Sequence, residues 1–145
     1  MFKLFIQKNM NFKDRKKYVE NNPYFTKENC PFCIINEEEK KLFIYETKYW
    51  KIIYNKYPYY SKKHLMAIPK RHIKYVTDLN DKEIIDFKNI ELYMKKFFDS
   101  EKNYYSFIRQ SLWWRSVEHL HYHYLPWHIS FEWENWINIL KIKNK

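Results

Sequence analysis

None of the 145 residues of this chain is glycine, and this absence limits what the chain can fold into. The P-loop and the GxGxxG turn both need glycine, because a residue without a Cβ atom lets the backbone pass close to a phosphate. Both of these nucleotide-binding loops are therefore excluded. Any phosphate that the chain binds must be held in another way.

Near the C-terminal end, residues 118–128 read EHLHYHYLPWH and hold four of the six histidines. His119, His121 and His123 alternate with apolar or aromatic residues, which predicts a strand with the three imidazoles on one face. The outer two histidines of such a strand lie about 13 Å apart, so the three cannot comfortably share one metal ion. Either a neighbouring pair binds a metal ion, or the histidines have different roles.

The remaining pattern predicts an α+β domain. A helix is expected over residues 79–99, which begin with the cap Leu79-Asn80-Asp81 and continue with apolar residues at helical spacing. Strands are expected where β-branched and aromatic residues gather between turn residues or prolines, over residues 42–46, 49–55, 64–68, 104–109 and 119–125. Strands around one long helix indicate an antiparallel sheet of about five strands with that helix packed on it.

The length of the chain, residues 1–145, is that of a single domain. Residues 1–27 are predicted to be a lysine-rich lead-in with a small helix, residues 28–127 the core, and residues 128–145 a tail with a short amphipathic helix. No apolar run is long enough to span a bilayer, and the N-terminus lacks the apolar region of a signal peptide. We therefore expect a cytoplasmic protein without a membrane partner.

The formal net charge of +10 has two interpretations. It could indicate an anionic partner, such as a nucleotide or a nucleic acid. It could also reflect a composition biased towards lysine, asparagine, isoleucine and aromatic residues. Lysine and arginine are spread along the chain without a dense block, so a dedicated nucleic-acid surface is the less favoured interpretation.

The two cysteines, Cys30 and Cys33, lie in the motif CPFC. In a reducing compartment this spacing indicates a metal site or a redox pair before a structural disulfide. Zinc requires four nitrogen or sulfur ligands, and His72 and His119 could supply the other two. The alternative is two small buried cysteines and an unrelated surface histidine.

The order of these motifs resembles that of the histidine triad (HIT) family of hydrolases and nucleotidyl transferases. The segment from His119 to Leu125 matches the family hallmark His-φ-His-φ-His-φ-φ, where φ is apolar. Ser116-Val117 matches the serine-valine step before the triad, and HLMAIPKRH, from His64 to His72, matches the strand with two further histidines. The resemblance covers residues 28–127 and is specific because CPFC, PKRH and the triad occur in this order.

The resemblance implies an α+β homodimer that acts on nucleoside 5′-phosphoryl compounds. It implies that His121 is the nucleophile, that His123 binds the phosphate, and that Ser116 contacts the phosphate or the leaving group. His64 matches a histidine close to the nucleophile. The expected activity is hydrolysis of a dinucleoside polyphosphate or a nucleoside phosphoramidate through a nucleotidyl-histidine intermediate, with release of a nucleoside monophosphate.

The resemblance also implies a structural zinc ion and a pocket for the base. In members with a CxxC motif, the zinc ligands match Cys30, Cys33, His72 and His119. The apolar side chains of the base pocket are expected from the first hairpin, at Phe43, Ile44 and Ile53.

The segment QSLWWR before the Ser-Val step departs from the family, which has glycines there. Trp113 and Trp114 could cover the leaving group or pack in a core or dimer contact. Arg109 lies near the place where many members have an asparagine, and Arg109 or Arg115 could bind phosphate as a fork or remain exposed. His128 is either a polar contact to the leaving group or a surface residue.

Two other function classes fit parts of the sequence. A metal-dependent enzyme could use the His-x-His pair as catalytic ligands, as in cupin-like sites, but such sites need a nearby carboxylate ligand. A non-catalytic, zinc-stabilised basic module could bind nucleic acid or a partner protein. That module leaves His121 and His123 without a role beyond packing.

Overall fold

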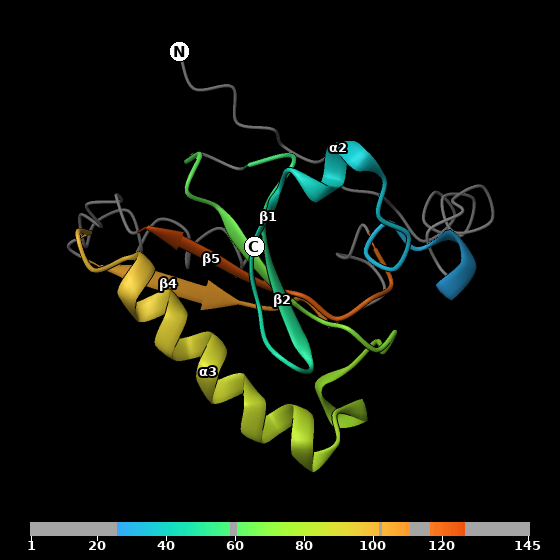
Figure 1. The fold of residues 1–145 in the computed structure, drawn as a ribbon. Helices are drawn as coiled ribbons and strands as arrows, with labels where there is room; N and C mark the ends of the chain where they lie inside the picture. The colour runs from blue at the N-terminus through green and yellow to red at the C-terminus, as the bar shows by residue number, and fades with distance from the viewer. Residues whose placement is uncertain (1–25, 59–60, 102, 111–116, 127–145) are drawn as a thin grey trace, which may run out of the picture.

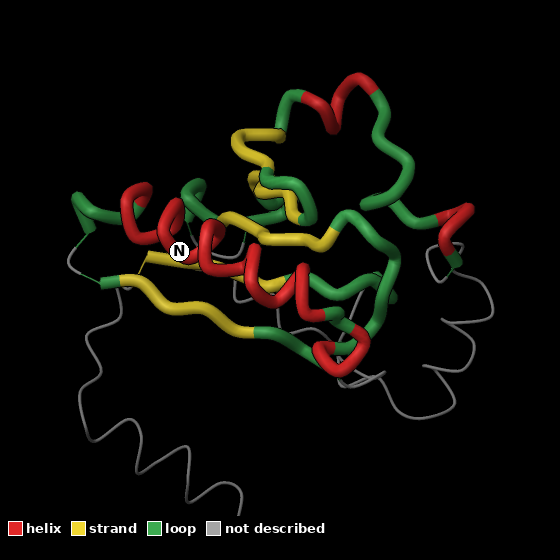
Figure 2. Tube along the Cα trace, turned by 60° about the horizontal axis from the view of Figure 1, so that its bottom comes forward, coloured by secondary structure: helices red, strands yellow, loops and turns green. Residues whose placement is uncertain are grey.

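The computed structural model describes residues 26–58, 61–101, 103–110 and 117–126. It contains a five-stranded antiparallel sheet in the order β1-β2-β3-β5-β4. The strands are β1 Phe43–Glu46, β2 Trp50–Tyr54, β3 Leu65–Pro69, β4 Tyr104–Phe107 and β5 Tyr122–Pro126. The long helix α3, Asp81–Phe97, lies across the sheet (Figures 1 and 2). The predicted α+β architecture is therefore confirmed.

Three short elements were not predicted from the sequence. They are the 3₁₀ turn η2 (Lys27–Asn29), the helix α2 (Glu37–Lys40) and the 3₁₀ turn η3 (Val76–Asp78). The predicted helices of the lead-in and of the tail lie outside the described residues, and the division of the chain into lead-in, core and tail stays a prediction. Within the described residues, no helix combines the length and apolar character needed to cross a bilayer.

Helix α3 begins where the sequence predicted. The side chain of Asn80 accepts a hydrogen bond from the backbone N–H of Glu83, and the Glu83 carboxylate accepts one from the N–H of Asn80. This reciprocal capping satisfies backbone donors that a helix start leaves without partners. The apolar pattern of the helix divides between core and surface. Its buried members are Ile90 and Met94, followed by the buried Phe98 just after the helix, whereas Ile84, Ile85 and Leu92 are exposed.

The hydrophobic core lies between α3 and the sheet. Trp50 and Ile52 of β2 pack there with Leu120 and Tyr124, and Tyr122 packs against them half-buried. The Trp50 indole N–H donates to the Glu83 carbonyl at 2.8 Å, which joins the sheet to the first turn of α3. The apolar residues between the histidines thus face the core, as the alternation predicted.

The histidine segment is only partly a strand. Strand β5 begins at Tyr122, three residues later than predicted. His119 and His121 precede it, because the backbone N–H of Leu120 donates to the carbonyl of Ile73 at 2.7 Å and so leaves the ladder to β3. The first two histidines are therefore held beside the loop that follows β3, and the third lies in the sheet.

The turns in the described residues are built without glycine, and no described residue has a positive φ. The turn between β1 and β2 is stabilised by a residue of the helix, Asp86 of α3. The Asp86 carboxylate accepts hydrogen bonds from the Thr47 hydroxyl at 2.6 Å and the Tyr49 N–H at 2.9 Å. A side chain from the helix thus fixes the hairpin that carries Phe43 and Ile53.

Candidate active site and metal centre

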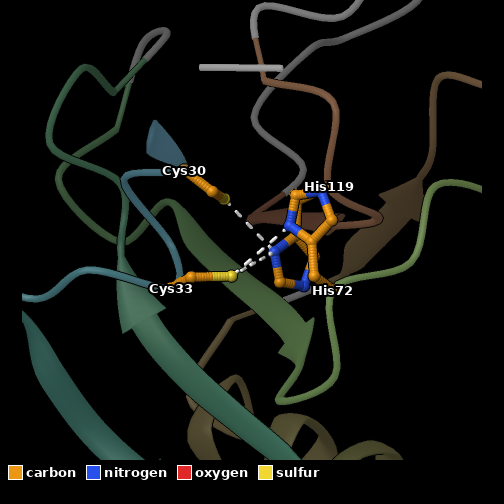
Figure 3. A group of neighbouring side chains, drawn as sticks. All are labelled: Cys30, Cys33, His72 and His119. Atoms are coloured by element: carbon orange, nitrogen blue, oxygen red, sulfur yellow. Dashed lines mark hydrogen bonds between the residues drawn. The ribbon is translucent and has the colours of Figure 1, made fainter. Parts of the chain in front are cut away.

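Four potential metal ligands come together from separate parts of the chain (Figure 3). Cys30 and Cys33 lie on the turn before α2, His72 follows β3, and His119 precedes β5. Their four ligand atoms lie within 4.8 Å of one another. The CxxC motif and the two predicted histidines therefore form one cluster, as the sequence indicated.

The spacing of the ligand atoms fits a tetrahedral ion. The His119 Nδ1 atom lies 3.3 Å from the Cys30 Sγ and 3.5 Å from the Cys33 Sγ, and the His72 Nδ1 lies 3.4 Å from the Cys33 Sγ. Bond lengths of about 2.3 Å for sulfur and about 2.0–2.1 Å for nitrogen predict edges of about 3.3–3.8 Å for a tetrahedral zinc site. These three separations already match the edges of such a site.

The protonation of His119 also fits a ligand. Its Nε2–H donates to the carbonyl of Pro69 at 2.8 Å, because a carbonyl oxygen can only accept. The lone pair is therefore on Nδ1, which faces the two sulfur atoms. A histidine that binds a metal ion through one ring nitrogen usually donates the N–H of the other ring nitrogen to an acceptor such as a backbone carbonyl.

Burial favours the neutral forms of the side chains in the cluster. Removal from water raises the pKa of the Cys30 thiol to about 12 and lowers the pKa of the His119 imidazole to about 3. The imidazole therefore stays neutral and able to bind a metal, whereas the Cys30 thiolate needs a bound cation to form near neutral pH. A neutral imidazole, and thiols that ionise when a metal binds, are compatible with a structural metal site.

The loop that carries His72 is tied to α3. The Arg71 guanidinium binds both carboxylate oxygens of Glu83, at 2.9 Å from Nε and 2.8 Å from Nη2. This two-point ion pair holds the residue next to His72, and Glu83 is itself buried at the start of the helix. The third ligand is thus positioned by a contact that also caps α3.

His121 lies beside this cluster and is almost completely buried. Its Nδ1–H donates to the carbonyl of His119 at 2.7 Å. Because that carbonyl can only accept, the proton of the neutral ring is on Nδ1, and Nε2 has the lone pair. The arrangement therefore provides one nucleophilic nitrogen whose partner nitrogen is already bonded to an acceptor.

His123 is joined to His64, which lies one residue before β3. The His64 Nε2 and the His123 Nδ1 are 2.8 Å apart, and the Arg109 Nη2 lies 3.4 Å from the His123 Nε2. The Asn55 amide nitrogen lies 3.2 Å from the His64 Nδ1. Because both outer partners are N–H donors, two neutral imidazoles in contact cannot accept at both ends, and His123 Nε2–H can donate to a ligand only where the Arg109 contact opens.

The pairing of strands builds a row of side chains beside the histidines. Across the sheet, Phe43 is opposite Ile53, Ile53 opposite Met66, Met66 opposite His123, and His123 opposite Phe107. Directly opposed residues share a face, so this row lies on the side of the sheet away from the core. The Phe107 ring stacks on His123 with centroids 4.8 Å apart.

The predicted base-pocket residues separate in the structure. Phe43 and Ile53 lie in the row that leads to His123, whereas Ile44 packs against the hydrophobic core. Five further residues singled out in the sequence lie outside the described residues: Trp113, Trp114, Arg115, Ser116 and His128. Met66, Phe107 and Asn55 were not predicted, since their place beside the histidines depends on strand register, which the sequence pattern does not specify.

We expect the buried histidines to make stability depend on pH. Burial lowers the pKa of His64 to about 4 and that of His123 to about 2, compared with about 6.5 when unfolded. As the pH falls below about 6.5, the unfolded chain binds these protons first. The free energy of unfolding should then decrease by up to about 1.4 kcal/mol per pH unit for each group.

Urea denaturation between about pH 7 and about pH 4.5 measures this loss. In His64→Gln the curve of stability against pH should be flatter than in the wild type, because one of the two groups is gone. Parallel curves would contradict the prediction.

Comparison with known proteins agrees with the geometry. Residues 29–136 match the family model described as "Scavenger mRNA decapping enzyme C-term binding". Comparison with curated proteins returned no significant match.

Several solved structures share the fold. A HIT family hydrolase from Clostridium thermocellum is 28% identical, with a TM-score of 0.56 over 72% of this chain and 94% of that one. A diadenosine triphosphate hydrolase from Plasmodium falciparum is 24% identical, with a TM-score of 0.54 over 66% of this chain. This chain spans 65% of the length of that Plasmodium structure.

A zinc-bound histidine triad family protein from Mycobacterium smegmatis is 19% identical, with a TM-score of 0.53 over 63% of this chain and 68% of that one. Its likeness, like that of the Plasmodium protein, lies in the fold. The family match covers most of the chain, and it coincides with the triad and with the cysteine–histidine cluster. The chain belongs to the histidine triad family.

Proposed function

We propose that this protein hydrolyses nucleoside 5′-phosphoryl compounds through a covalent nucleotidyl-His121 intermediate and releases a nucleoside monophosphate. The observation that carries the proposal is the 2.7 Å hydrogen bond from His121 Nδ1–H to the His119 carbonyl. It leaves the lone pair on Nε2 and supplies an acceptor for the charge that forms on the ring. The hydrolase activity of the Clostridium and Plasmodium relatives supports it.

In the first step, Nε2 of His121 attacks the α-phosphorus. A nitrogen–phosphorus bond forms while the bond from phosphorus to the leaving group breaks, and the leaving group departs with the electron pair and takes up a proton. The ring becomes an imidazolium, which the His119 carbonyl stabilises through Nδ1–H. Covalent catalysis thereby replaces one difficult displacement by two easier ones.

In the second step, water attacks the same phosphorus. A new oxygen–phosphorus bond forms, the bond to Nε2 breaks, and the water gives up a proton. His121 returns to its neutral form with the proton on Nδ1, ready for another substrate. The product is the nucleoside monophosphate.

The charge on the phosphate needs oriented donors, and His123 and Arg109 are the described residues best placed to supply them. His123 adjoins His121, with ring centroids 4.9 Å apart, and Arg109 lies against His123. We assign phosphate binding to both. Ser116 and Arg115, from the adjoining segment, are proposed as further phosphate or leaving-group contacts. The nucleoside would lie along the row from Phe43 and Ile53 to His123.

We propose that Cys30, Cys33, His72 and His119 hold a structural zinc ion. All four positions of a tetrahedral ion would then be filled by the protein, so the ion would have no open position for substrate. Its contribution would be to join the N-terminal turn, the loop after β3 and the segment before β5. The reacting phosphate would instead be attacked by His121 and bound by His123 and Arg109.

Release of AMP by the purified protein tests the proposal. The substrates are adenosine 5′-phosphoramidate and diadenosine triphosphate, given to the zinc-loaded protein without added magnesium. We expect AMP from at least one of them, and a sample quenched in denaturant at alkaline pH, where the phosphorus–nitrogen bond survives, should contain protein whose mass is increased by one nucleotidyl group. If neither substrate yields AMP nor labels the protein, the proposed hydrolase activity is wrong for this adenosine substrate class.

We also propose that the protein is a homodimer that uses an apolar side of α3. Ile85 and Leu92 are 73% and 57% exposed, and residues seven positions apart lie on one side of a helix. Exposed apolar side chains that gather on one side often mark a protein interface. Size-exclusion chromatography with light scattering should give the mass of a dimer for the wild type.

The double variant Ile85→Glu/Leu92→Glu should elute as a monomer with an unchanged far-UV circular dichroism spectrum. The matched control is Lys82→Glu/Lys95→Glu, which places two glutamates at exposed polar positions of the same helix. A monomeric wild type, or a double variant that remains a dimer, would contradict this interface.

A further inference from the structure

A groove of about 620 Å³ lies between α3 and β1, the strand at one edge of the sheet. Its lining residues are Tyr45, Asn89, Leu92, Tyr93, Lys96 and Phe97. The lining thus combines three aromatic rings with a lysine and has no carboxylate. Leu92 also belongs to the proposed dimer interface, so the two surfaces adjoin at this residue.

The groove and the proposed catalytic site lie on opposite faces of the sheet. Tyr45 is opposite Ile52 in the pairing of β1 with β2, and Ile52 is part of the core between the sheet and α3. Directly opposed residues share a face, whereas the row that contains His123 faces away from the core. A ligand in the groove would therefore not contact the reacting histidines.

The rings in the groove are nearly parallel and reach the surface. Tyr45 and Tyr93 stack with centroids 4.3 Å apart and planes at 13°, and Tyr93 and Phe97 lie 6.3 Å apart at 22°. Tyr45 is 37% exposed. Parallel rings that reach water offer π faces on which further flat rings can stack. The groove therefore favours a ligand with planar aromatic groups.

Lysines extend the same side of α3. Lys82, Asn89 and Lys96 are exposed and lie seven positions apart, so they share one side of the helix. Neither lysine is in an ion pair within the described part of the chain. Asp86, one turn before Asn89, is half-buried and already accepts hydrogen bonds from that amide and from the β1–β2 turn. The two ammonium groups are therefore available to a negatively charged ligand.

We propose that this groove binds single-stranded nucleic acid, with bases stacked on Tyr45 and Tyr93 and phosphates beside Lys96 and Lys82. Proteins that bind single strands combine aromatic stacking with positive charge in this way. The net charge of +10 attracts a polyanion to the whole surface, and the groove adds faces for unpaired bases. An apolar peptide would make no use of the lysines. This inference does not depend on the proposed hydrolase function.

Fluorescence anisotropy with a labelled oligothymidylate of about ten nucleotides measures the binding. The protein is the zinc-loaded full chain, with excess AMP to occupy the histidine site. Two comparison ligands are an abasic oligomer of the same length and a duplex of the same sequence. We expect both to bind at least about tenfold more weakly, because the first has no bases and the second keeps its bases within its own stack.

Two pairs of variants locate the binding in the groove. Tyr45→Leu removes a ring and should weaken binding of the oligothymidylate by about tenfold, but not that of the abasic oligomer. Its matched control is Tyr57→Leu, at a 76% exposed position in the loop after β2, which should bind like the wild type.

Lys96→Glu should weaken binding and lower the slope of log Kd against log salt by about 0.7 or more. Its matched control is Lys95→Glu, the same change at an exposed position about 100° further around the helix, and its effect should be clearly smaller. All four variants should release AMP at the rate of the wild type, because the groove lies on the other face of the sheet.

Equal affinity for the oligothymidylate, the abasic oligomer and the duplex would overturn the inference, since binding would then follow net charge alone. Equal losses in Lys95→Glu and Lys96→Glu would have the same meaning. If no oligonucleotide binds and Tyr45→Leu instead changes the mass found by light scattering, the groove belongs to the contact with a second copy of the chain. If Tyr45→Leu fails to fold, the abasic oligomer and the lysine pair decide the question.

Discussion

In His121→Ala, AMP release should fall by at least about a thousandfold, because removal of a nucleophile leaves only the binding contacts to catalyse the reaction. The substitution deletes the nitrogen that would form the bond to phosphorus and the hydrogen bond to the His119 carbonyl. The variant should also show no increase in mass after a quench in denaturant at alkaline pH, whereas the wild type should show one. Single-turnover assays with excess enzyme measure the loss without interference from product release.

The matched comparison is His123→Ala, which removes the neighbouring histidine of the same triad. Because His123 is proposed to bind phosphate, its loss should reduce the rate by about a hundredfold and should still permit nucleotidylation of His121. Binding of AMP to both variants, measured by calorimetry, would show that the site is intact. If His121→Ala retained more than about a tenth of the activity, the nucleophile would have to be assigned to another residue.

In Cys33→Ser, Tm should fall by about 10 °C or more and zinc binding should be lost. The expected cause is the loss of ties between distant segments, because the ligands come from the N-terminal turn, the loop after β3 and the segment before β5. A structural zinc ion contributes about 10–16 kcal/mol in small zinc-finger peptides, and only part of this is needed for such a shift in a chain of this length. Differential scanning calorimetry and metal analysis of the purified proteins measure both effects.

Chelation provides the control for this prediction. A strong chelator should lower Tm of the wild type to the value of Cys33→Ser and should have no effect on the variant itself. Cys30→Ser should behave in the same way, since both sulfur atoms lie against the His119 Nδ1. If the chelator and both substitutions left Tm unchanged, the cluster would be a packed group of cysteines and histidines without a structural ion.

Much of the fold could be predicted because it depends on local patterns. The capping residues Asn80 and Glu83 locate the start of α3 by hydrogen bonds within one turn. The alternation from His119 onward separates a core face, with Leu120 and Tyr124, from a histidine face. The metal cluster was predicted from ligand types and family resemblance. The cluster forms in the structure because the antiparallel strand order places the end of β3 beside the segment before β5.

The length of β5 and the exposure of the helix were decided by contacts between distant residues. Strand β5 begins later than predicted because the N–H of Leu120 donates to the carbonyl of Ile73. Local propensity does not specify this contact. Ile85 and Leu92 have the same apolar character as Ile90, yet only Ile90 meets the sheet. Helical periodicity defines an apolar stripe, but the width of the buried part depends on where the sheet lies.

The sequence by itself determined the residue types, their order and the alternation that separates the core residues Leu120, Tyr122 and Tyr124 from the histidines. Those properties follow from side-chain chemistry and from the periodicity of strands and helices. Only the tertiary structure decided the distances between the cysteines and their histidines, that His121 donates its proton to the His119 carbonyl, and that Phe32 lies against His121. The reason is physical: these contacts join segments up to 89 positions apart, as Cys30 and His119 are, and strand register and turn closure set their geometry.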